Sequence, residues 1–161
     1  YTELSEKAAD VPAGLGNPVY GRLDAKWTYA LMGVNAVKGV EIGDGFAVSG
    51  ATGTANADCM TKAGFVTNHA GGILGGISDG ATLTAHVAIK PTPSVRLPLA
   101  SLDEAGNEVE VVTTGRHDPC VGLRAAPVLE AVTALILMAA AGAMRQLGTK
   151  ISVSVAFCSQ G

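Results

Sequence analysis

The chain has 161 residues, enough for one domain with its own core, and a formal net charge of −3. It contains no basic stretch, so we expect no nucleic-acid partner. The three cysteines lie far apart and form no C-x-x-C pair, which disfavours a disulfide framework and structural zinc and favours a reducing cytoplasm. The first residues are neither basic nor apolar, so no signal peptide is predicted.

The composition is apolar for a small domain. Hydrophobic residues make up 48% of the chain and charged residues 16%, whereas about a quarter of residues are charged in an average soluble domain. This surplus predicts burial against something else: a missing half, a partner subunit or a membrane. The 21 glycines favour tight turns and close backbone approaches over a helical bundle.

The first half of the chain predicts one helix and one strand. Turn residues fill 11–18, and Asp24 is a plausible N-cap for the helix that follows. Apolar residues at helical spacing mark its buried face: Leu23, Trp27, Ala30, Leu31 and Val34. A β-branched strand is expected at Val37–Ile42, followed by a loop from Ser49 to Gly64.

The second half predicts a glycine-rich loop, several strands and a long helix. The loop runs from Asn68 to Gly80, and its glycines imply that the backbone passes close to a ligand or another segment. Alternating patterns predict strands at Leu83–Ile89, Val95–Leu102, Val109–Thr113 and Ile151–Phe157. Pro127 is expected to open a helix that runs to Met144. The order predicts a single α+β domain, 1–161, with helices packed on a mostly antiparallel sheet and an atypical tail at 145–161.

The segment Ala125–Met144 is long and apolar enough to span a membrane. Its one charge, Glu130, would be costly in lipid, and no aromatic residue flanks its ends. We therefore predict a buried core helix and no membrane partner.

Two polar segments could bind a phosphate or carry a proton. Lys90 ends an apolar strand, and with Thr92 and Ser94 it could hold a phosphate; from the residues alone, a solvated strand end is the better fit. Arg116 and Asp118 share a loop bounded by Gly115 and Pro119, where they could form a binding site or a surface ion pair.

The remaining polar residues give weaker signals. His69, in the glycine-rich loop, could act as an acid, a base or a capping hydrogen-bonder, whereas His86 alternates within a strand and fits a structural role. Glu41 and Asp44 fit a turn better than a catalytic pair. No phosphate-binding P-loop and no histidine pair with metal-ligand spacing is present, so no metal is expected.

Four strings together resemble the carboxyl-terminal signatures of chorismate synthases, in family order. They are N-A-V-K-G-V-E-I-G-D-G-F at 35–46, N-H-A-G-G-I-L-G-G-I-S at 68–78, K-P-T at 90–92 and G-R-H-D-P-C at 115–120. The resemblance runs from about Val11 to about Met144. It implies that the chain is the carboxyl-terminal half of such an enzyme, and half of a β-α-β sandwich in which two antiparallel sheets enclose helices.

The resemblance also implies an activity. Chorismate synthases eliminate phosphate from 5-enolpyruvylshikimate 3-phosphate to give chorismate, the last step of the shikimate pathway towards aromatic amino acids. This anti-1,4-elimination requires reduced FMN without net redox change; NADP is associated with flavin reduction, and the source of the electrons is left open. The enzymes are cytoplasmic carbon–oxygen lyases and usually homotetramers.

By similarity, the flavin contacts would be Asn35, Ala36, Gly75, Lys90, Pro91, Thr92, Pro93, Ser94 and Arg116. Asp118 matches an aspartate placed near the flavin N5, where it assists proton transfer. Pro93 stands where serine is more usual and removes a hydroxyl donor. The histidines and arginines of the family's amino-terminal half have no counterpart here, so a catalytically inactive FMN- or phosphate-binding or oligomerisation fragment is the alternative.

Overall fold

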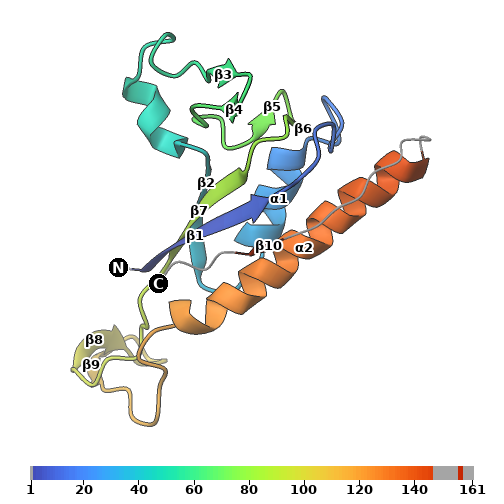
Figure 1. The fold of residues 1–161 in the computed structure, drawn as a ribbon. Coiled ribbons are helices and arrows are strands. Elements are labelled where there is room, and N and C mark those ends of the chain that lie inside the picture. Colours follow the sequence, from blue (N-terminus) through green and yellow to red (C-terminus); the bar gives the residue numbers. More distant parts are fainter. Residues whose placement is uncertain (1, 147–155, 158–161) are drawn as a thin grey trace.

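The computed structural model describes residues 2–146 and 156–157 (Figure 1). Its main sheet has four antiparallel strands in the order β10-β1-β7-β2. In chain order the elements are β1 (Thr2–Ala9), α1 (Leu23–Met32), β2 (Val37–Ile42), the 3-10 helix η1 (Gly45–Gly50), β3 (Met60–Thr61), β4 (Gly64–Phe65), β5 (Ile73–Leu74), β6 (Ile77–Ser78), β7 (Leu83–Ile89), β8 (Leu99–Leu102), β9 (Glu108–Val111), α2 (Gly122–Gln146) and β10 (Ala156–Phe157). The predicted α+β class, with helices on a mostly antiparallel sheet, is confirmed.

The core lies between one face of the sheet and the two α-helices. On β7 the alternating residues Leu83, Ala85, Val87 and Ile89 are buried, as the pattern predicts. The helices are joined by a buried hydrogen bond, 2.9 Å long, that the Trp27 Nε1–H donates to the Thr133 hydroxyl. The indole is thereby packed and satisfied, which fixes α1 against α2.

The helix α1 begins at Leu23 with Arg22 at the N-cap, so the prediction of Asp24 as N-cap is wrong. Asp24 lies in the first turn and accepts a hydrogen bond from the backbone N–H of Ala25. The N–H of Leu23 donates instead to the carbonyl of Gly76, at 2.8 Å. A residue of the glycine-rich loop thus satisfies the helix end, and a Cβ on Gly76 would lie 2.4 Å from the Arg22 side chain, so the contact requires glycine.

The helix α2 begins at Gly122 rather than at Pro127, which lies inside it. By length and composition α2 could cross a membrane, the one such helix in the described residues, and 22% of its apolar window is buried. Leu129, Thr133 and Leu137 face the core. The core-helix prediction therefore holds for one face, whereas the opposite face is exposed.

The strand β1 was not predicted. Its inward positions are Leu4, Glu6 and Ala8, and the glutamate interrupts the apolar alternation. The predicted strand Ile151–Phe157 falls largely outside the described residues; within them, Ala156–Phe157 pairs with β1. The predicted strands Val95–Leu102 and Val109–Thr113 form shorter, at Leu99–Leu102 and Glu108–Val111.

Residues 91–121 form an arm that projects from the end of the sheet where β7 ends and α2 begins (Figure 1). Its hairpin, β8–β9, pairs Leu99 with Val111 and Leu102 with Glu108. No residue of the arm is buried. The arm therefore has no core of its own.

Candidate functional site

The candidate site lies where the arm joins the sheet. The backbone N–H of Lys90, just after β7, donates to the carbonyl of Ala36 at 2.9 Å. Asn35 and Ala36 follow α1 directly and precede β2, and Ala36 has a φ of 72°. Two segments that the resemblance assigned to the flavin site, separated in the sequence by the whole of β2 to β7, thus meet at one end of β2 and β7.

A second pair of segments is held together within the arm. The Thr92 hydroxyl donates to the carbonyl of Asp118 at 3.0 Å. The Arg96 guanidinium donates to the carbonyl of Gly115 at 3.2 Å. These two hydrogen bonds bring the segment after β7 against the Gly115–Cys120 loop, so the positions of Lys90, Thr92, Arg116 and Asp118 are linked through the backbone.

Cations dominate this region. Lys90, Arg96, Arg116 and Arg124 contribute positive charge, and one carboxylate, Asp118, lies 3.2 Å from the Arg124 guanidinium. Both partners of that ion pair are largely solvent-exposed, so its net stabilising effect is small. The guanidinium groups of Arg96 and Arg116, which share a hollow whose lining contains no carboxylate, are suited to an anionic ligand such as a phosphate.

Two hollows flank the junction. One, of about 630 Å³, lies on the arm and is lined by Arg96, Arg116, His117 and residues 112–115. The other, of about 490 Å³, opens on the outer face of the sheet. Its lining includes Lys38, Lys90, Pro91 and the cross-strand pair of Glu3 with His86, whose Nδ1 lies 3.0 Å from a Glu3 carboxylate oxygen. This contact fits the structural role expected for His86.

Gly75 is not brought to this cluster. It lies in the β5–β6 turn, next to the Gly76 carbonyl that accepts from the first residue of α1. Asn35 follows the last turn of the same helix, and 10 helical residues rise by about 15 Å. Gly75 is therefore at the opposite end of α1 from the other predicted flavin contacts.

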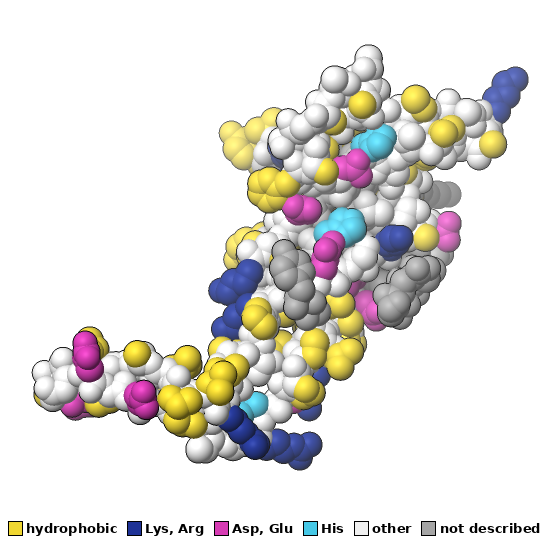
Figure 2. All heavy atoms as spheres, turned by 90° about the vertical axis from the view of Figure 1, so that its left-hand side faces the viewer, with side chains coloured by type: hydrophobic (Ala, Val, Ile, Leu, Met, Phe, Trp, Pro, Cys, Tyr) yellow, Lys and Arg dark blue, Asp and Glu magenta, His cyan; other side chains and the backbone are white. Residues whose placement is uncertain are grey.

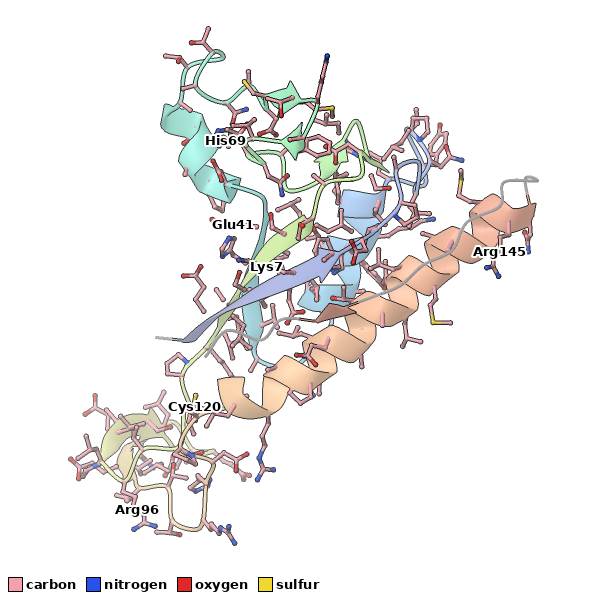
Figure 3. All side chains as sticks on the ribbon, viewed as in Figure 1. Lys7, Glu41, His69, Arg96, Cys120 and Arg145 are labelled. Atoms are coloured by element: carbon pink, nitrogen blue, oxygen red, sulfur yellow. The ribbon has the colours of Figure 1, made fainter. Side chains whose placement is uncertain are left out.

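His69 also lies away from the cluster, at the opposite end of the molecule from Arg96 (Figure 3). Its Nδ1 is 2.6 Å from an Asp44 oxygen, and this hydrogen bond raises the pKa of the imidazole. The Asp58 carboxylate accepts from the backbone N–H groups of His69 and Ala70, at 2.7 and 2.9 Å. These contacts fix the start of the glycine-rich loop, which favours the capping interpretation of His69.

Sequence reasoning missed three residues of this arrangement: Asp58, Arg96 and Arg124. Arg96 was discoverable in principle, because it follows the Lys90–Ser94 segment closely and is the next cation along the chain. Asp58 and Arg124 carry no local pattern, and only the folded chain brings them to their partners.

The family follows from comparison with known proteins. A family model described as chorismate synthase matches residues 4–141. The chain belongs to the chorismate synthase family. The chorismate synthase of Stenotrophomonas maltophilia is 61% identical over 131 residues, and that of Thiobacillus denitrificans is 59% identical over 135 residues. The family recognised from the four strings is thus confirmed.

The chain spans only part of these relatives. The alignment with the Stenotrophomonas chorismate synthase covers 81% of this chain but 36% of that relative. The alignment with the Thiobacillus chorismate synthase covers 84% of this chain and 37% of that relative. A crystal structure of chorismate synthase matches with a TM-score of 0.53 and 35% identity, over 56% of this chain and 29% of that chain. The chain therefore matches about a third of the length of these chorismate synthases.

Proposed function

We propose that this chain supplies the flavin-binding portion of a chorismate synthase, a cytoplasmic carbon–oxygen lyase that converts 5-enolpyruvylshikimate 3-phosphate to chorismate and phosphate. The observation that carries the proposal is the hydrogen bond from Thr92 to the Asp118 carbonyl. It joins the two segments that bear the candidate phosphate-binding cations and the candidate proton carrier. The homotetramer and the link to NADP belong to the same proposal.

The donor set fits the phosphate tail of FMN. The Lys90 ammonium provides a point charge, Thr92 and Ser94 provide hydroxyl donors, and the Arg116 guanidinium provides a planar fork. Pro91 and Pro93 donate no hydrogen bond but restrict the backbone between these groups. Reduced FMN, when bound, would supply the electron density on which loss of phosphate without net redox change depends.

The remaining assigned residues would orient the ring and move the proton. Asn35 and Ala36 lie beside Lys90 through its bond to the Ala36 carbonyl, within reach of the same ligand. The Asp118 carboxylate, 3.2 Å from Arg124, could hold or accept a proton at its oxygen atoms while the guanidinium keeps it oriented. The contribution of Gly75 stays a prediction, since it lies at the other end of α1.

The exposed face of the helical layer supports docking of the rest of the enzyme. On α2, Val128, Leu135 and Met138 are exposed at spacings of seven and three residues, typical of a helix-packing seam. A hollow of about 980 Å³ beside α1 is lined mainly by apolar residues, with Val132 of α2 among them and Arg22 and Asp24 at the start of α1. Burial of this surface against a further layer would complete the sandwich.

The test is anaerobic turnover of 5-enolpyruvylshikimate 3-phosphate with reduced FMN. We expect no chorismate from this chain alone, and chorismate when the amino-terminal part of a relative is added as a separate chain. Turnover by the chain alone would show that all catalytic groups lie within it. Failure of both, together with unchanged FMN fluorescence on adding the chain, would contradict the proposal.

A second candidate is an FMN- or phosphate-binding fragment without turnover, because all the donors named above come from this chain. It predicts a change in FMN fluorescence and no chorismate even after complementation. Chorismate formation after complementation therefore separates the two candidates, and Asp118→Asn then tests the proposed proton carrier. In an active complemented enzyme it should lower turnover by about 10²–10⁴-fold, as loss of a general acid–base does, with little change in FMN affinity. Equal turnover in both forms would remove Asp118 from the mechanism.

A further inference from the structure

The arm carries opposite charges at its two ends. Four carboxylates and no cation lie on the hairpin at its tip: Asp103, Glu104, Glu108 and Glu110. At its base lie Arg96 and Arg116, beside the hollow of about 630 Å³. Among the described residues, none of these six side chains forms an ion pair. Figure 2 shows carboxylates at the outer end of the arm and cations where it joins the body.

The hairpin also has two unlike faces. Because directly paired residues of an antiparallel ladder share a face, Leu99 and Val111 lie on one side with Ser101 and Val109, and this side carries no charge. The other side carries Leu102 with Glu108 and Glu110. A two-stranded hairpin is at best marginally stable alone in water, and Leu99 and Val111 are each 50% exposed. The uncharged side therefore lacks a covering layer.

We propose that the arm is a dimerisation element that pairs antiparallel with the arm of a second copy of this chain. The acidic tip of each copy then lies over the cationic base of the other, and the two uncharged sides pack together between these ends. The pairing is two-fold and self-complementary, so each contact occurs twice. A parallel arrangement would instead bring tip to tip and base to base, which like charges oppose.

The charge pattern selects this partner over others. An acidic tip repels nucleic acid and anionic lipid, whereas a second copy presents cations at its base and an uncharged side on its hairpin. The apolar seam on α2 lies on a different element and remains available for another layer. The proposal does not rest on the flavin function, since it uses only the charges and faces of the arm.

The experiment is sedimentation velocity on the chain without FMN, in low and in high salt. Screening should raise the dimer Kd by about tenfold or more at high salt, because the contacts are between exposed charges. The tip variant Glu104→Lys/Glu108→Lys and the base variant Arg96→Glu should each weaken the dimer by a similar factor. Arg116 is left intact, since it belongs to the proposed flavin site. Lys62→Glu, an exposed charge reversal on the β3–β4 turn, is the matched control and should leave the Kd unchanged.

The deciding measurement combines the two variants. Mixed in equal amounts, the tip and base variants should regain the parental Kd, because lysines at one tip then meet a glutamate at the other base. A monomeric parent at low salt, reversals that leave the Kd unchanged, or a mixture that stays monomeric would each overturn the proposal. Circular dichroism checks that each variant folds. If the tip variant has a lowered melting temperature, Glu104→Gln/Glu108→Gln takes its place, because it removes the negative charges without adding positive ones.

Discussion

The core and the arm of this chain differ in how they are held together. In the core, apolar residues from β7, α1 and α2 are fully buried and the one buried indole has its hydrogen-bond partner. In the arm no residue is buried, and hydrogen bonds to backbone carbonyls hold its segments together. The chain therefore builds a scaffold from its own residues, whereas its charged arm has no covering layer within the described residues.

The largest expected effect comes from breaking the core. Trp27 is fully buried and Tyr29, on the same helix, is 84% exposed. Trp27→Ala should lower the free energy of unfolding by about 3–5 kcal/mol, because it leaves a cavity and an unpaired Thr133 hydroxyl. Tyr29→Ala should change it by less than about 0.5 kcal/mol. Urea denaturation followed by circular dichroism measures both, and equal losses would mean that α1 does not pack as described.

How far the sequence could predict each region depends on where the information lies. The alternation on β7 is local, so strand and burial were predictable together. On β1 an inward Glu6 removed the pattern, and only pairing with β7 defines that strand. The four strings led to the assignment of the candidate flavin contacts, yet they did not predict that Thr92 reaches the Asp118 carbonyl or that Gly75 lies at the far end of α1. Those relations depend on the path of the chain in space, which no local pattern encodes.

The second effect concerns a buried carboxyl group in the core, that of Glu6. Glu6 is 5% exposed, and its burial, together with the charge of Glu130 on α2, raises the pKa of its carboxyl from 4.5 to about 7. Between those two pH values the folded state keeps a proton that the unfolded state has lost, so stability falls as pH rises through this window. Above pH 7 the cost is complete, at about 3 kcal/mol.

Glu6→Gln should therefore stabilise the chain by about 3 kcal/mol at pH 8 and have little effect at pH 4. Glu3→Gln is the matched control, because Glu3 lies on the same strand with its side chain 58% exposed. Chemical denaturation across this pH range gives the comparison. A stability difference between Glu6→Gln and the parent that is constant with pH would show that Glu6 is not desolvated.

The third effect tests whether the arm junction binds the flavin phosphate. Lys90→Ala should weaken FMN binding by about 1.5–3 kcal/mol, the value of a charge-assisted hydrogen bond. Lys26, exposed on α1, lies outside the junction, so Lys26→Ala should leave the affinity unchanged. Fluorescence titration of FMN separates the two, and equal affinities in both variants would remove Lys90 from the site. A loss confined to Lys90 would assign ligand binding to the junction rather than to the core.

The smallest effect is expected in the arm, and it compares an exposed leucine of the arm with a buried leucine of the core. Leu102 is 64% exposed on the acidic side of the hairpin, whereas Leu129 is fully buried on α2. Leu129→Ala should cost about 2–5 kcal/mol of unfolding free energy, while Leu102→Ser should change it by less than about 0.5 kcal/mol. Hydrogen exchange of the monomer, measured in high salt where the arms should not pair, should agree, with slow amides on β7 and fast ones on β8, because an uncovered hairpin opens without unfolding the domain. If Leu102→Ser destabilised the whole chain, the arm would be packed on the core and the division between scaffold and binding surface would fail.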